Sequence, residues 1–139
     1  MALLTAFVLA QTVAATTASI TTLAWGSSSQ IQESREVVVR SEPEWETLWS
    51  LHSSEPRPEV DFSQLLVVAV FLGTRRTAGY EVEITAARSE GDRVVVEYVE
   101  QRPPGDSLVA QVLTAPFHLV SLPREVGEID FRKAEVTEK

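Results

Sequence analysis

Apolar runs and alternating patterns predict that most of this chain folds as β-strand. Residues 65–72 (LLVVAVFL) are apolar throughout, which is the pattern of a strand buried on both faces in the middle of a sheet. Residues 80–86 (YEVEITA) alternate, with Ala86 on the apolar side, and this predicts a half-buried strand. Further strands are expected at residues 35–40, 93–100, 108–113, 117–122 and 128–132.

One helix is predicted after the first of these strands. Ser41 is followed three residues later by Glu44, which is the spacing of a capping box, and Pro43 is tolerated in a first turn. The side chains that then recur at helical spacing on one face are Trp45, Leu48, Trp49 and His52. Residues 55–58 (EPRP) end the helix and form an extended linker.

These elements predict a mainly β fold, a β-rich α+β domain. We expect an antiparallel sheet or sandwich of about six to eight strands with one short helix that bears two tryptophans. Short turns such as 91–92 and 103–106 join the strands. No series of crossover helices separates the strands, so a doubly wound α/β fold is excluded.

The first residues of the chain carry no charge. The 12 basic and 20 acidic residues all follow Gln32. Residues 1–18 contain an apolar run followed by small residues, which predicts a signal peptide that leaves a single domain at 19–139. A membrane anchor is one alternative. The other is that the segment is neither, and that residues 20–25 already form the first strand of the domain. We expect an exported protein, periplasmic or secreted.

Composition excludes several classes of protein. The 139 residues contain no cysteine, which excludes disulfides, a thiol nucleophile and a cysteine-linked lipid anchor. A formal charge of −8 argues against a nucleic-acid partner. We expect no metal, no cofactor and no stable membrane insertion, and the sequence leaves the oligomeric state open.

Catalytic signatures are absent from the sequence, and we expect no enzyme. The two histidines, His52 and His118, lack the spacing of a zinc site. We interpret His52 as structural, and His118 as either structural or part of a binding loop. Glu81 and Glu83 lie on one face of a strand, roughly 7 Å apart, where alternating glutamates are typical of a solvated surface.

The segment 73–79 (GTRRTAG) is a candidate binding loop. Its glycines permit a tight path between two strands, and Arg75 and Arg76 stand side by side in an acidic protein. Adjacent arginines bind carboxylates or phosphates, but they are equally common as solubilising residues at the tip of a hairpin.

Several segments together resemble the PrcB C-terminal domain family, named for a subunit of a protease complex. The resemblance is carried by residues 61–84, the turn 103–105, residues 114–118 and 122–124, and the helix with Trp45 and Trp49. Members usually have Gly-x-Arg-Pro-Thr-Gly/Ala-Gly-Tyr, and here Arg76 replaces the proline. The named subunit is a lipoprotein, whereas this chain has no cysteine to acylate.

The resemblance implies a non-catalytic, exported accessory domain that binds or stabilises a protease, plausibly an envelope peptidase. On this reading the loops at one end of the domain bind the protein partner. The residues that we assign to partner binding are Arg75, Arg76, Thr77, Tyr80, Pro104, Phe117 and His118.

Two alternatives concern the same loops. Residues 75–80 resemble a loop of chagasin-like inhibitors of cysteine peptidases, β-sandwiches that insert loops into an active site. An inhibitor of this kind would use residues 74–79, 103–106 and 114–118. A small-ligand or glycan binder would instead show a hollow near these loops.

Overall fold

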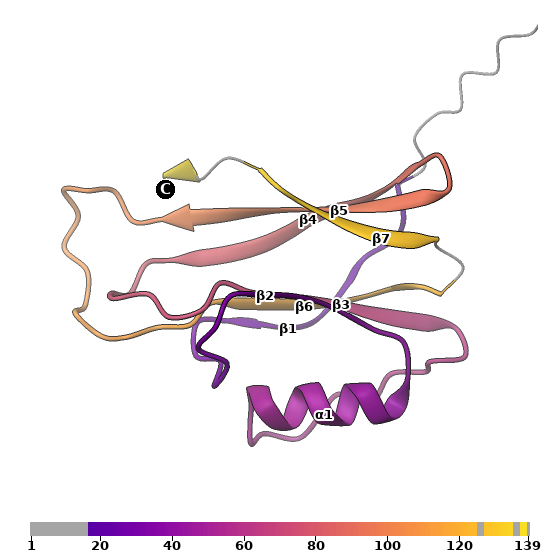
Figure 1. Cartoon of the computed structure of the whole chain (residues 1–139). Helices are drawn as coiled ribbons and strands as arrows, with labels where there is room; N and C mark the ends of the chain where they lie inside the picture. Colours follow the sequence, from indigo (N-terminus) through magenta and orange to yellow (C-terminus); the bar gives the residue numbers. More distant parts are fainter. Residues whose placement is uncertain (1–16, 125–126, 135–136, 139) are drawn as a thin grey trace, which may run out of the picture.

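The chain forms a sandwich of two β-sheets with one helix packed on the outside (Figure 1). The computed structural model describes residues 17–124, 127–134 and 137–138. Within them lie β1 (Thr21–Gly26), β2 (Arg35–Val39), α1 (Glu42–His52), β3 (Leu65–Phe71), β4 (Glu81–Glu90), β5 (Arg93–Arg102), β6 (Phe117–Pro123), β7 (Glu128–Lys133) and β8 (Thr137–Glu138). The predicted fold class, a β-rich sandwich with one short helix, is confirmed.

Each sheet of the described part has four strands, and the two sheets differ in their pairing. The first sheet has the order β1-β6-β3-β2 and is antiparallel throughout. The second has the order β4-β5-β7, and β8 also pairs with β5. Only β4 and β5 are antiparallel there, because β7 and β8 run parallel to β5. The first sheet has the antiparallel pairing that we expected, whereas the parallel pairing of β7 and β8 was not predicted: the chain passes through β6 in the opposite sheet before it returns as β7.

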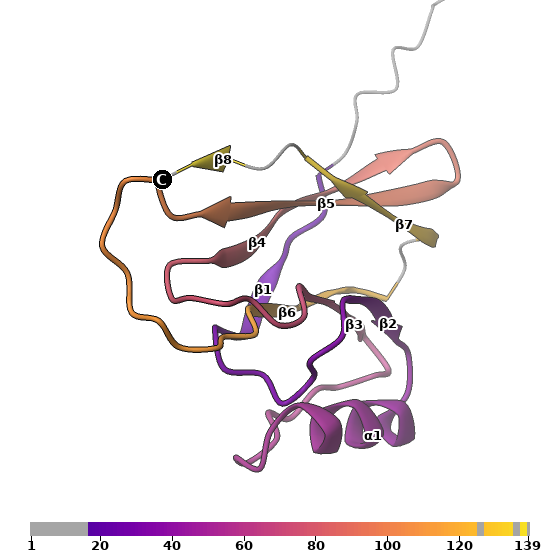
Figure 2. The same cartoon turned by 60° about the vertical axis from the view of Figure 1, so that its left-hand side comes forward.

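Strand β3 has apolar contacts on both of its faces, as the unbroken run 65–72 predicts. Leu66, Val68 and Val70 pack between the two sheets against β4 and β5. Val67 and Phe71 face the other way and pack against the tryptophans of α1. Figure 2 shows why both faces are covered: β4 and β5 lie on one side of the β3 sheet and α1 on the other.

Helix α1 begins and packs as predicted. The Ser41 hydroxyl accepts a hydrogen bond from the Glu44 amide (3.4 Å) and donates one to the Glu44 carboxylate (3.0 Å). The Trp45 indole donates to the carbonyl of Pro58 (2.9 Å), and that of Trp49 donates to the carbonyl of Glu55 (2.8 Å). The two tryptophans therefore hold the linker after the helix as well as covering the sheet.

The predicted strand at residues 108–113 is wrong. This segment has no strand structure, and Leu108 and Leu113 are 104% and 75% exposed. A strand needs a free edge to pair with, and the neighbouring strands have none. β5 lies between β4 and β7, and β6 lies between β1 and β3. Residues 103–116 are therefore a long loop.

The alternation in β4 breaks where the sequence gives no warning. The pairing of β4 with β5 shifts between Ile84 and Ala86. After this bulge the buried side chain is Ala87, not Ala86 as the alternation predicted.

The start of the domain is folded against β4. Residues 1–16 of the predicted signal peptide lie outside the described residues, so that prediction stays a prediction. The amide of Ala18 donates to the carbonyl of Ala87 (2.8 Å), and Ala18 and Ile20 pack against the core between the sheets. The first strand begins at Thr21, close to the expected Ile20.

Candidate functional site

Three loops meet at one end of the sandwich, the left side of Figure 1. They are residues 27–34, 73–80 and 103–116, and we call them together the loop end. Arg75 and Thr114 exchange two backbone hydrogen bonds (2.7 and 2.9 Å), and the amide of Ala78 donates to the carbonyl of Ala110 (3.0 Å). The amide of Ala115 donates to the carbonyl of Ser27 (2.8 Å). The loop 103–116 is thus fastened to both of the others.

Arg75 turns inward and holds its loop to β5. Its guanidinium forms two hydrogen bonds with the carboxylate of Glu100, Nε to Oε2 (3.1 Å) and Nη2 to Oε1 (3.0 Å). Its third nitrogen, Nη1, donates to the carbonyls of Leu72 (3.0 Å) and Thr74 (3.3 Å). Every nitrogen of the guanidinium is therefore used within the domain.

Glu100 is a buried carboxylate that receives two cations. It is 6% exposed, and Lys133 of β7 donates to its Oε1 at 3.0 Å. Burial alone would raise the pKa of Glu100, but the hydrogen bonds from Arg75 and Lys133 outweigh it and lower the pKa below its ordinary value. Glu100 is thus the ionised centre that joins the loop 73–80, β5 and β7.

The other predicted residues of the loops 73–80 and 103–116 have different environments. Arg76 is exposed and makes no hydrogen bond or ion pair with any described residue. The Tyr80 ring is half-buried, with the Arg75 guanidinium 5.8 Å from its centroid. The carbonyl of Thr77 accepts from the Thr114 hydroxyl (2.9 Å), and the carbonyl of Pro104 accepts from the amide of Ser107 (3.0 Å).

Phe117 and His118 belong to the core and are not exposed at the loop end. Phe117 faces α1 and packs against His52, with ring centroids 4.3 Å apart. His118 points to the other side of β6, between the sheets, and is 3% exposed. The structure does not bring these two side chains together with the exposed residues of the loops, so we leave them out of the proposed surface.

His118 binds a backbone amide at the outer edge of β4. Its Nδ1 accepts a hydrogen bond from the amide of Ile84 (2.8 Å), and its Nε2 lies 2.9 Å from the hydroxyl of Thr22. An acceptor Nδ1 requires the neutral imidazole with the proton on Nε2. Burial favours this neutral form and lowers the pKa of His118 to about 4.

The sequence did not point to the apolar side chains that the loop end exposes. Leu108, Val112 and Leu113 project from the loop 103–116. The sequence placed them in a predicted strand at 108–113. The signal that was available is the turn at 103–106, which separates them from β5.

A hollow of about 320 Å³ opens beside the loop end. Trp25 is 51% exposed there; its indole donates to the carbonyl of Val82 (2.7 Å) and stacks on His118 (5.1 Å between centroids). The lining residues are Trp25, Gly26, Ser27, Ala78, Gly79, Tyr80 and Glu81. A small-ligand binder would need such a hollow, but this one offers few polar groups to orient a ligand.

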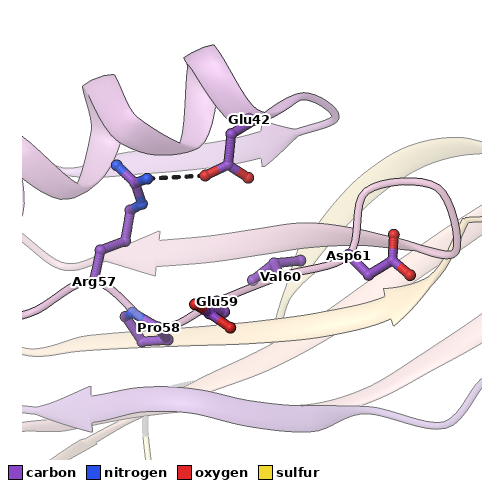
Figure 3. A pocket seen from close by; sticks show the side chains of 6 residues that line it. All are labelled: Glu42, Arg57, Pro58, Glu59, Val60 and Asp61. Atoms are coloured by element: carbon purple, nitrogen blue, oxygen red, sulfur yellow. Dashed lines mark hydrogen bonds and ion pairs between the residues drawn. The ribbon is translucent and has the colours of Figure 1, made fainter.

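A larger, more polar hollow of about 650 Å³ lies under the start of α1, away from the loop end (Figure 3). The Arg57 guanidinium reaches across it to the carboxylate of Glu42 (2.9 Å). Glu59 and Asp61 also line it. Hydrogen bonds from Ser63 lower the pKa of Asp61. The ion pair holds the linker to the helix.

A second histidine contact is also structural. Nδ1 of His52 lies 2.8 Å from the hydroxyl of Ser29, which in turn accepts a hydrogen bond from the amide of Ile31 (3.1 Å). Burial lowers the pKa of His52, against a smaller opposing effect of Glu55. A catalytic triad needs a carboxylate hydrogen-bonded to the imidazole, and within the described ranges none contacts His52.

Neither a metal cluster nor a membrane helix is found in the described part of the chain. No group of three or more histidine, aspartate or glutamate side chains there is arranged to hold a metal ion. No helix there has the length and apolar character needed to cross a membrane.

The family model described as PrcB C-terminal matches residues 66–123. This part of the chain is therefore similar to the PrcB C-terminal family. The match runs from β3 to β6 and includes the loops 73–80 and 103–116 together with Glu100. Curated proteins and solved structures give no significant match.

The resemblance to the PrcB C-terminal family seen in the sequence is thus confirmed. The matched part of the domain contains the Arg75–Glu100 ion pair and the exposed loop 103–116, whereas β1, β2 and α1 lie outside it. Arg75, which matches the arginine of the family's loop motif, makes an internal contact in this domain.

Replacing Arg75 tests this internal role. Arg75→Ala leaves the buried Glu100 with Lys133 alone, and we expect it to lower the free energy of unfolding by about 3 kcal/mol. Arg76→Ala is the matched control, because it removes the same charge from the next, exposed residue; it should change the free energy by less than about 0.5 kcal/mol. Urea denaturation of both variants measures the difference. Equal effects would show that the ion pair does not stabilise the fold.

The buried His118 predicts a loss of stability in mild acid. Its pKa is about 4 in the folded protein, against an ordinary value of 6.5 for an exposed imidazole, so the unfolded chain binds the proton first as the pH falls. Stability should be full above about pH 6.5 and should fall by about 3 kcal/mol as the pH decreases to 4.

The control for this prediction is His118→Gln, which keeps an acceptor for the amide of Ile84 but does not titrate. Urea denaturation between pH 7 and 4 should show a shallower pH dependence in the variant, by up to one proton, while His52 still contributes in the same direction. Identical pH profiles would contradict the role given to His118.

Proposed function

We propose that this domain is a non-catalytic, exported accessory module that binds a protein partner through its loop end, and that the partner is an envelope peptidase. One observation carries the proposal most strongly. Leu108, Val112 and Leu113 are exposed on a loop that is fastened to the rest of the domain rather than free.

Exposed apolar side chains on a fixed loop favour recognition. Burying them against a partner gains the hydrophobic free energy that the isolated domain forgoes. The backbone hydrogen bonds of Arg75, Ala78 and Thr114 position the loop before binding, so less conformational entropy is lost in the complex.

The charges beside the loop suit a polar rim around this apolar centre. Arg76 is exposed and has no partner among the described residues, so it is available to a carboxylate of the bound protein. Arg75 has no free nitrogen, and we therefore assign the charged contact to Arg76 alone.

A non-catalytic role is supported by the chemistry of the loop end. Both imidazoles near it are buried: His118 has both ring nitrogens in hydrogen-bond contact and cannot serve as a base for a bound substrate, and Nδ1 of His52 contacts the hydroxyl of Ser29. The carboxylate of Glu100 is held by Arg75 and Lys133. The loop end thus exposes apolar side chains suited to binding and no free catalytic group among those named here.

An inhibitor of a cysteine peptidase is the second candidate. It is favoured by the close pairing of residues 73–80 with 103–116, since two adjoining loops form a wedge. The loop differs from the chagasin-like pattern in its structure as well as in its sequence, because the Arg75 side chain points into the domain. Loss of papain-type activity on addition of the purified domain would favour this candidate over an accessory role.

Capture of the partner from the envelope fraction of the source cells tests the leading proposal. The wild-type protein should retain a peptidase, and the double variant Leu108→Ser/Leu113→Ser should retain at least about tenfold less of it. Leu51→Ser is the matched control, because Leu51 is an exposed leucine on α1, away from the loop end. It should capture the peptidase as well as the wild type does.

Two results would contradict this proposal. Equal capture by the double variant and the control would exclude the loop end as the binding surface. Recovery of the native protein only from the cytoplasm would contradict export and an envelope partner.

A further inference from the structure

The outer edge of β2 is unpaired in the described structure. β2 is the last strand in the order β1-β6-β3-β2, and no described segment lies beyond it. An edge of this kind presents backbone N–H and C=O groups to any extended chain that approaches. The backbone groups at the outer edge of β4, by contrast, already form hydrogen bonds with the Trp25 indole, the His118 imidazole and the Ala18 amide.

The register identifies the backbone groups of β2 that point outward. The amide of Leu72, just after β3, donates to the carbonyl of Pro116, just before β6. In this register the backbone groups of even-numbered residues of β3 form hydrogen bonds with β6. Odd-numbered residues of β3 therefore bond to β2, and their partners in β2 are odd-numbered too. The N–H and C=O groups of Glu36 and Val38 are left pointing outward, and no described residue pairs with them.

An apolar groove of about 450 Å³ runs along this edge, between β2 and α1. Leu51, which is 50% exposed, lies on its helix side. The lining residues are Arg35, Val37, Val38, Val39, Pro43, Glu44, Thr47, Leu48 and Leu51. The free backbone groups and the apolar side chains thus lie side by side, which suits a β-strand as the occupant.

We propose that the occupant is a second copy of this chain, paired antiparallel through β2 about a two-fold axis at Val37. In this register Glu36 of each copy stands opposite Val38 of the other. The four outward groups of each copy then find partners, and four hydrogen bonds join the two sheets into one.

The charges of the edge disfavour the register centred on Glu36. In the register about Val37 no like charges stand directly opposite: Glu36 lies diagonal to Arg40 and to Glu36 of the second copy, and its carboxylate already accepts a hydrogen bond from the Tyr98 hydroxyl. A register centred on Glu36 would place the two glutamates opposite each other.

The register centred on Val38 is disfavoured for a different reason. It would need the backbone of Arg40, whose N–H already approaches Glu44 (3.5 Å) and whose C=O accepts from Arg124 (2.8 Å). The register about Val37 needs only groups that are free.

The same pairing closes the groove. Two copies of α1 flank the joined β2 strands, so each groove continues into the other and Leu51 of both copies faces the shared space. Because the strands run antiparallel, the two loop ends point in opposite directions and stay exposed. The dimer is therefore independent of the partner-binding proposal.

Sedimentation equilibrium of the full chain at up to about 1 mM tests the proposal. The wild type should be a reversible dimer, and Leu51→Lys should raise the dimer dissociation constant by about tenfold or more, because a lysine ammonium of each copy would be enclosed in the apolar groove. Leu113→Lys, the same change on the exposed loop 103–116, should leave the dissociation constant unchanged. A lysine in the last turn of α1 also suits the helix dipole, so folding should be preserved.

Amide hydrogen exchange gives a second measurement that needs no variant. The amides of Glu36 and Val38 should gain protection as the protein concentration rises, whereas that of Val37, bonded to β3, should be protected at every concentration. A monomeric wild type would overturn the proposal and leave the edge to another protein. A dimer that leaves these two amides unprotected, or that Leu113→Lys dissociates as strongly as Leu51→Lys, would also overturn it.

Discussion

The ion pair between Arg75 and Glu100 is the contact on which the loop end depends. Glu100 is buried near the end of β5, and a buried carboxylate is stable only when cations and hydrogen-bond donors surround it. Arg75 supplies two of these donors and Lys133 the third. The loop 73–80 is fixed by this contact, and the loop 103–116 is fastened to it in turn through Thr114 and Ala110.

A second constraint comes from the edges of the sheets. A β-sandwich must satisfy or protect the backbone groups of its outer strands. Here β4 is protected by an imidazole, an indole and the chain that precedes β1. Because β2 has no such cover in the described structure, it is the edge from which we infer dimerisation. His118 contributes to the protection of β4 by accepting a hydrogen bond from the Ile84 amide. Its burial keeps the imidazole neutral, as this hydrogen bond requires.

Patterns that depend on neighbouring residues predicted the fold well. The capping residues of α1, the face with Trp45 and Trp49, and the doubly buried β3 all follow from local spacing. The loop 103–116 was not predicted, because its apolar residues resemble a strand and only the topology shows that β5 and β6, the strands on either side of it, are already paired along both edges. The parallel pairing of β7 depends on the path of the chain through the other sheet, which no local pattern encodes.

The candidate site was predicted only in its location. The sequence indicated residues 73–80 and 103–106, but it could not show that Arg75 has a buried partner 25 residues away. Because of that long-range contact, the two adjacent arginines have different roles: Arg75 stabilises the fold, and Arg76 is exposed.

Hydrogen exchange at the loop end of Arg75→Ala tests the central claim most directly. The amides of Ala78 and Thr114, which bond to Ala110 and Arg75 across the two loops, should be protected in the wild type. In the variant they should lose protection, while amides in the middle of β3 and β6 keep theirs. Unchanged protection of Ala78 and Thr114 would contradict the claim that the Arg75–Glu100 ion pair holds the loop end together.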